Sequence, residues 1–125
     1  MSDGEHQEGQ TWEAIMSANK FKIQNLIAIV DYNGLQIEGT TDEVMPLGDL
    51  AQKYKDFGWE VREIDGNDFA QILSALQWAD DCEKPAVILA RTLLGKGVSF
   101  MENNWKYHDW AGNLDDAGKA QIELS

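Results

Sequence analysis

Two short stretches of the sequence carry residues that could hold a metal ion. The first is Asp3-Gly4, and the second is Asn33-Gly34-Leu35, about 30 residues further along. Carboxylate, side-chain amide and backbone carbonyl oxygens are all ligands that a hard cation such as Mg²⁺ accepts. A glycine turn at the end of a strand also lets a bound anion approach the backbone. The two stretches together predict a site where a cation binds and holds an anionic group.

Each stretch also has a simpler interpretation. Asp-Gly and Asn-Gly are common turn dipeptides, so either one alone indicates only a turn. The pairing is what favours a site, because an Asp at the end of one parallel strand and an Asn at the end of its neighbour would meet at the same edge of the sheet.

Three segments could provide such strands. Leu26 to Val30 and Ala86 to Ala90 are nearly continuous apolar runs, which predict strands buried on both faces of a parallel sheet. Trp59 to Ile64 alternates apolar and charged residues, which favours a position nearer an edge. An open sheet of this kind also needs a strand that leads into the Asp3-Gly4 turn, so we expect the fold to lack its first strands.

Helical periodicity links these strands. It covers three segments: Gln10 to Lys20, Leu47 to Phe57 and Phe69 to Trp78. Asn67 or Asp68 could cap the third helix, and Gly58 stands where a glycine ends the second. The alternation of helices and strands predicts an α/β fold, a parallel sheet with helices on both faces. Residues 1–125 would form a single partial domain, with 95–125 as a glycine-rich loop and a short helix over 115–124.

Composition excludes several classes of function. Acidic residues outnumber basic ones 22 to 10, giving a net charge of -12, which opposes nucleic-acid binding. No apolar run reaches the roughly 20 residues that cross a bilayer. Cys82 is the single cysteine, so no disulfide can form within the chain, and we expect a cytoplasmic protein. Its acidic neighbours oppose thiolate formation, so we expect a passive thiol.

Four motifs resemble transketolase, especially the N-terminal section of split transketolases. They are SDGEHQEGQTWEA from Ser2, NLIAIVDYNGLQI from Asn25, GWEVREIDG from Gly58 and TLLGKGVSFMEN from Thr92. The resemblance extends over nearly the whole chain and thins after Trp110. It implies part of a thiamine diphosphate-binding fold, with Mg²⁺ and thiamine diphosphate as cofactors.

The resemblance also implies roles for individual residues. Asp3 and Asn33 would bind Mg²⁺ through side-chain oxygens, and Leu35 through its carbonyl. Gly4 would lie against the diphosphate. Glu8 corresponds to a catalytic glutamate at the subunit interface that supports activation of the cofactor. Two further residues would lie on the diphosphate side, namely His108 and Lys96.

The chain departs from the family pattern at two of these places. Ser2 replaces the first glycine of Gly-Asp-Gly, and Asp109 follows His108 where the family usually has glycine, which adds negative charge beside the diphosphate. His6 falls at a position that varies in the family, and we expect it on the surface.

Two hypotheses follow for function. In the first, the chain is a component of an enzyme that transfers ketol groups between sugar phosphates, and it acts only when complementary transketolase chains complete the site. In the second, it is a non-catalytic α/β module that self-associates, as a homo-oligomer such as a dimer, or binds a partner protein. We expect neither a nucleic acid nor a membrane as partner.

Overall fold

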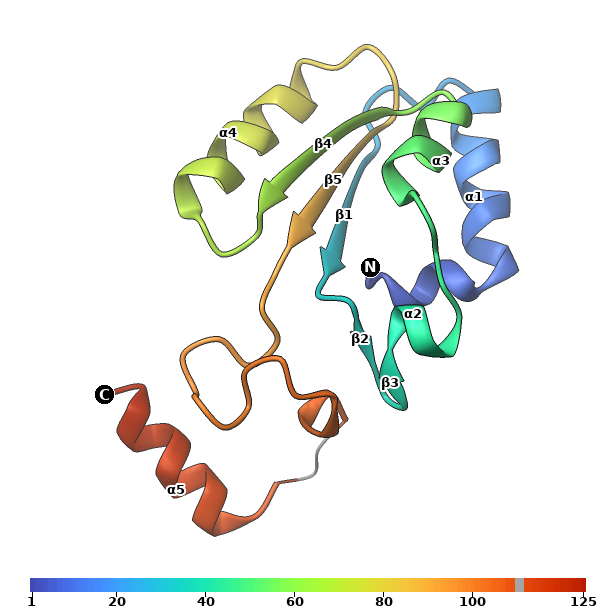
Figure 1. Ribbon diagram of the computed structural model, residues 1–125. Coiled ribbons are helices and arrows are strands. Elements are labelled where there is room, and N and C mark those ends of the chain that lie inside the picture. Colours follow the sequence, from blue (N-terminus) through green and yellow to red (C-terminus); the bar gives the residue numbers. More distant parts are fainter. Residues whose placement is uncertain (110–111) are drawn as a thin grey trace.

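A three-stranded parallel sheet forms the centre of the fold (Figure 1). The computed structural model describes residues 1–109 and 112–125. The strands are β1 (Ile27–Tyr32), β4 (Glu60–Asp65) and β5 (Ala86–Arg91), in the order β1-β5-β4. The predicted parallel α/β fold is therefore confirmed. Among the described strands, β4 pairs only with β5, so its predicted edge position is confirmed too.

Helices cover both faces of this sheet. On one face, α1 (Gly9–Lys20) and α3 (Leu50–Asp56) pack with Val87 and Leu89 of β5. On the other face, α4 (Phe69–Asp80) packs with Ala86, Ile88 and Ala90 of the same strand. Because alternate residues of β5 face opposite sides, its apolar run is buried throughout, as the sequence predicts.

The other apolar strand, β1, is not buried on both faces as expected. α4 packs on β4 and β5, and Ile29 of β1 remains 48% exposed. An apolar cleft of about 360 Å³ lies there, lined by Met1 and Ile29 together with Ile72 and Leu76 of α4. A second cavity of about 310 Å³ lies on the opposite face beside Met1, Leu26 and Ala28.

The first three residues run parallel to the outer edge of β1. The amino group of Met1 donates to Ile29 O at 2.9 Å, and Asp31 N donates to Met1 O at 2.9 Å. Ser2 forms an isolated parallel bridge with Asp31. Met1 and Ser2, which precede the Asp3-Gly4 turn, are therefore paired with β1 as the end of a parallel strand would be.

Local capping sets the helix boundaries. α4 starts where predicted, because the Asp68 carboxylate accepts from the N–H groups of Ala70 and Gln71. α3 is shorter than predicted, because Asp49 caps it through Gln52 N at 2.8 Å and the helix starts only at Leu50. Gly58 has a φ of +83° after α3, as expected of a helix-ending glycine.

Several short elements were not predicted. A 3₁₀ turn, η1 (Gly4–Gln7), precedes α1, and a hairpin of β2 (Leu35–Gln36) and β3 (Gly39–Thr40) follows β1. The remaining two are α2 (Thr41–Val44), which begins with a capping box at Thr40, and the 3₁₀ turn η2 (Trp105–Tyr107). All are too short to leave a periodic pattern in the sequence.

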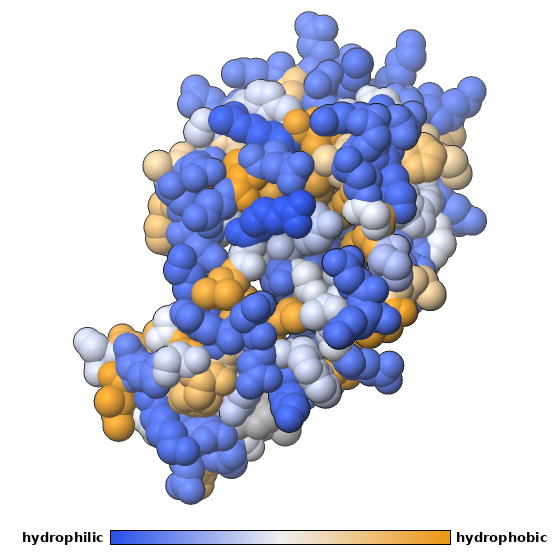
Figure 2. All heavy atoms as spheres, in the orientation of Figure 1, coloured by the Kyte–Doolittle hydropathy of each residue, from blue (hydrophilic) through white to orange (hydrophobic). Residues whose placement is uncertain are grey.

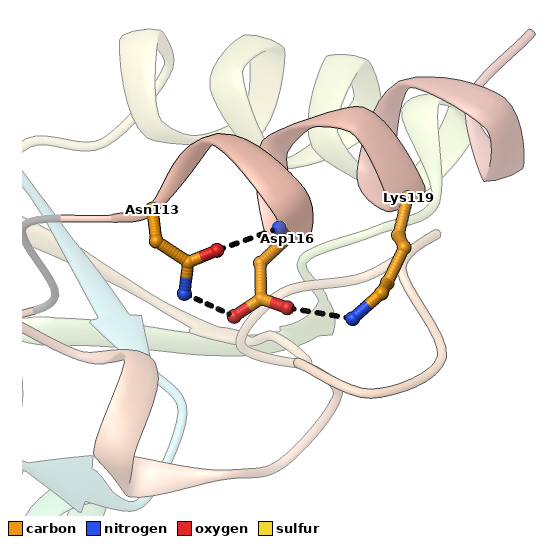
Figure 3. A network of polar contacts seen from close by, with 3 residues as sticks. All are labelled: Asn113, Asp116 and Lys119. Atoms are coloured by element: carbon orange, nitrogen blue, oxygen red, sulfur yellow. Dashed lines mark hydrogen bonds and ion pairs between the residues drawn. The ribbon is translucent and has the colours of Figure 1, made fainter.

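In the described part of residues 95–125, a loop that contains η2 is followed by the helix α5 (Leu114–Glu123), close to the predicted helix. In Figure 1 α5 lies at the far end of the molecule from α1 and α3. Asn113 caps it through Asp116 N at 2.8 Å, and Lys119 forms an ion pair with Asp116 (Figure 3). Ser99 N and Oγ donate to Glu123, which connects α5 to the loop.

Hydrophilic residues predominate on the face shown in Figure 2, as the net charge of -12 leads one to expect. Apolar side chains are also exposed at the α5 end, including Leu114, Ile122 and Leu124. Within the described residues, no helix combines the length and the apolar character required to cross a bilayer.

Candidate functional site

The turns that carry Asp3 and Asn33 are in direct contact. Asp3 N donates to Asp31 O at 3.1 Å, which places Asp3 at the end of β1. Its Oδ2 atom accepts from the N–H of Gly34 at 2.6 Å, and its Oδ1 atom from the N–H of Gly4 at 2.8 Å. The predicted meeting of the two stretches at one edge of the sheet is therefore what the fold produces.

The Asn33-Gly34 turn gives this contact its shape. Asn33 Oδ1 accepts from the N–H of Leu35 at 2.8 Å, which closes a side-chain turn. Gly34 has a φ of +74°, a conformation that L-residues rarely adopt. This geometry turns the Gly34 N–H towards Asp3 and starts the β2–β3 hairpin at Leu35.

Asp3 carries a buried carboxylate. Its side chain is fully buried, and no Lys or Arg of residues 1–109 and 112–125 forms an ion pair with it. Burial raises the pKa of the Asp3 carboxyl, the nearby Asp31 adds to the rise, and the hydrogen bonds from Gly34 and Gly4 oppose it. A bound cation would compensate this buried charge.

The chemistry of the donors fits Mg²⁺. Asp3, Asn33 and the Leu35 carbonyl offer hard oxygens from the two touching turns. The described residues contain no group of three or more His, Cys, Asp and Glu side chains suited to a metal. The three oxygens would therefore be supplemented by oxygens of a bound ligand or of water.

An open groove of about 420 Å³ lies beside these turns. Its lining comes from η1, the β2–β3 hairpin and the end of η2: Ser2, Gly4, Glu5, Gln7, Glu8, Gln36, Ile37, Glu38 and His108. Gln36 Oε1 is buried and has no hydrogen-bond partner among the described residues. This atom lies close to Gly4, 3.7 Å from where a Cβ would be. A bound group could satisfy it.

The fold brings most of the predicted site residues together. Gly4, Glu8 and His108 line the groove, while Asp3, Asn33 and Leu35 form the touching turns beside it. His108 reaches this place because it directly follows η2, which packs against β3. Lys96 is different, because it is exposed in the 95–104 loop and does not line the groove.

The expectation for His6 is wrong. Its side chain is only 1% exposed, and its Nε2 atom lies 2.8 Å from the hydroxyl of Tyr54. The η1 turn directs His6 under the Asp3 backbone, where it packs against the ring of Trp12. A polar residue in a turn is expected to be exposed. The burial of His6 depends on its contact with Tyr54, which lies far away in the sequence.

Other residues behave as the sequence suggested. Burial raises the pKa of the Cys82 thiol, with Glu60 and Asp81 adding to the rise, which agrees with a passive thiol. Asp68 acts as a helix cap. Its neighbour Asn67 accepts from Leu93 N at 2.9 Å and so ties the loop after β5 to the end of β4.

Comparison with protein families gives one match over nearly the whole chain. Residues 1–124 match the sequence model of the transketolase thiamine diphosphate binding domain. Among curated proteins, the chain is 40% identical over 126 aligned positions to an apulose-4-phosphate transketolase subunit of Phocaeicola vulgatus, covering 100% of this chain and 45% of that protein. It is 44% identical to a 6-deoxy-6-sulfo-D-fructose transketolase subunit of a Clostridium species, covering 87% of this chain and 40% of that one.

Solved structures agree with these sequence relatives. The transketolase of Campylobacter jejuni superposes with a TM-score of 0.90 at 32% identity, covering 98% of this chain and 19% of that one. The transketolase of Leishmania mexicana gives a TM-score of 0.89 at 28% identity, covering 98% and 18%. The chain thus spans less than half the length of the curated subunits that it matches.

Proposed function

Because the chain belongs to the transketolase family through its thiamine diphosphate binding domain, we propose that it supplies the Mg²⁺ and diphosphate part of a transketolase site. In this proposal it takes part in ketol transfer between sugar phosphates only when other transketolase chains complete that site. The contact between the Asp3 carboxylate and the Gly34 N–H carries the proposal, because it joins the two ligand-bearing turns.

The residues around this contact would each have a role. Asp3, Asn33 and the Leu35 carbonyl would hold Mg²⁺, and Gly4 would lie against the diphosphate. The groove is lined by three carboxylates, Glu5, Glu8 and Glu38, which would repel a free diphosphate. Such an anion would therefore bind together with its metal rather than alone.

The remaining predicted residues would act around the ligand. His108 lines the groove and would contact the diphosphate. Lys96 could reach it only from the exposed loop. Glu8 is exposed at the start of α1, where a completing chain could contact it and where it would support activation of the cofactor. Bound thiamine diphosphate would supply the thiazolium that stabilises a carbanion.

The open side of β1 supports the need for completion. Apolar cavities lie on both faces of the sheet beside Met1, and Ile29 is half exposed. Further strand and helix residues would fill them. Residues 1–125 would then be one partial domain of a larger cytoplasmic assembly.

The same open face supports the second hypothesis, a non-catalytic module that self-associates. A second copy could cover Ile29, Ile72 and Leu76, which line the cleft on this side and are exposed or partly exposed. The hypothesis predicts a homodimer without cofactor affinity, whereas the first predicts cofactor binding whether or not copies associate.

A binding measurement separates the two. The full chain is titrated with thiamine diphosphate by calorimetry, once with Mg²⁺ and once with EDTA, and thiamine monophosphate serves as the matched control ligand. We expect weak binding that needs both Mg²⁺ and the diphosphate. Absence of binding up to about 1 mM ligand, or binding unchanged by EDTA, would overturn the proposed function.

A further inference from the structure

A buried network of hydrogen bonds lies directly beneath the Asp3 turn. His6 Nδ1 is 3.0 Å from Ser2 O and 3.2 Å from Asp3 O, and His6 Nε2 is 2.8 Å from the Tyr54 hydroxyl. His6, Tyr54 and Asp3 are all at most 1% exposed. This network thus links Tyr54 of α3, in the core, to the backbone that carries the Asp3 carboxylate.

The partners fix the tautomer of His6. Both groups that face Nδ1 are carbonyl oxygens, which only accept, so Nδ1 must carry the proton. When the ring is neutral, Nε2 has a free lone pair and accepts from the Tyr54 O–H. The other neighbour of that hydroxyl is the Met1 sulfur at 3.7 Å, a weaker acceptor at a longer distance.

Burial and packing hold this arrangement. Burial raises the pKa of the Tyr54 hydroxyl, so Tyr54 keeps the proton that it donates. The indole N–H of Trp12 donates to His6 O at 2.7 Å, and its ring packs edge-on against the imidazole. The ring of His6 is therefore held from two sides as well as at both nitrogens.

From this arrangement we infer that His6 and Tyr54 are positioning residues for the proposed metal and diphosphate site. They clamp the Ser2–Asp3 backbone from the α3 side, opposite the hydrogen bond that Asp3 N makes to Asp31 O of β1. The clamp keeps the Asp3 carboxylate against the Gly34 N–H, where it can share a cation with Asn33. The inference rests on the proposed function for its purpose, but its geometry can be tested without a cofactor.

The test uses NMR on the full chain without metal or cofactor. Long-range ¹H–¹⁵N spectra should show His6 as the neutral tautomer protonated at Nδ1. The rate of hydrogen exchange at the Gly34 amide then reports how firmly Asp3 is kept in its hydrogen bond to that amide. Relative to wild type, His6→Leu should speed this exchange by roughly fivefold or more. His6→Asn should rescue part of the protection, because its amide can still donate to Ser2 O.

Two variants refine the test. Tyr54→Phe should also speed Gly34 exchange, because the imidazole loses the donor that orients it. Ile88→Val is the matched control, since it trims the core on the α4 face and should lower global stability without a selective effect on Gly34. A proton on Nε2 instead of Nδ1, or Gly34 exchange that is equal in wild type and His6→Leu, would overturn the inference.

Calorimetry with Mg²⁺ and thiamine diphosphate then distinguishes the two proposals. A raised Kd in His6→Leu, with rescue in His6→Asn, would support the positioning role. Unchanged affinity in His6→Leu would overturn it. If the wild-type chain binds no cofactor, the proposed function fails, while the tautomer and Gly34 exchange still decide whether the clamp exists.

Discussion

Single residues at the two touching turns are constrained by conformation as much as by chemistry. Gly34 has a φ of +74° and open space where a Cβ would be. We expect Gly34→Ala to destabilise the chain by about 1–2 kcal/mol through backbone strain alone. Gly9→Ala is the control, because Gly9 begins α1 and is also uncrowded. Urea unfolding that gives equal stability for both variants would contradict this conformation.

Substitution of Glu8, in contrast, should impair the proposed function and leave the stability of the chain nearly unchanged. It is exposed and makes no side-chain capping hydrogen bond at the start of α1. We expect Glu8→Gln to change the free energy of unfolding by less than about 0.5 kcal/mol. In an assembly completed by other chains, the same variant should lose most ketol transfer. A large loss of stability in the isolated chain would show that Glu8 is structural.

The positions of the site residues could be predicted from the sequence where the ends of strands bring them together. The contact between the Asp3 and Asn33 turns could be predicted, because parallel strands place their ends at one edge. The burial of His6 could not, because it depends on Tyr54, which lies 48 positions further along the chain. The buried Oε1 atom of Gln36 could not be predicted either, because Gln36 lies in a short hairpin that leaves no periodic pattern in the sequence.

Among the elements, α5 offers the clearest test of local stability. Asn113 accepts from Asp116 N and donates to the Asp116 carboxylate, so it holds the first turn (Figure 3). We expect Asn113→Ala to cost about 1 kcal/mol of helix stability and to speed amide exchange within α5. Gln121→Ala, on the exposed part of the same helix, is the control. Faster exchange in β5 as well would contradict a purely local effect.

Helix boundaries could be predicted where the sequence contains a residue that commonly starts or ends a helix. Asp68 and Gly58 marked their helix ends correctly. The start of α3 was placed too early, because Leu47 continues the apolar pattern although Asp49 caps the helix. The prediction that β1 is buried on both faces was wrong. An apolar run indicates that a strand can be buried, but it does not indicate which strands a given helix covers.

At the scale of the whole molecule, the open face beside β1 governs association. If copies associate through it, Ile29→Lys should shift the chain towards monomer in sedimentation velocity, because a charge would be buried at the contact. Phe21→Lys is the matched control, since Phe21 is 73% exposed at the end of α1, which packs on the other face. A monodisperse wild-type monomer, or equal effects of both variants, would contradict self-association through this face.

We propose above that the two touching turns hold Mg²⁺ and a diphosphate, and this proposal can be tested directly. Its most direct test is an NMR titration of the full chain with thiamine diphosphate in the presence of Mg²⁺, followed at the amides of Gly4, Gly34 and Leu35. We predict that these amides shift, that EDTA reverses the shifts, and that Asp3→Asn abolishes them. Shifts confined to other residues, or unchanged in Asp3→Asn, would contradict the claim.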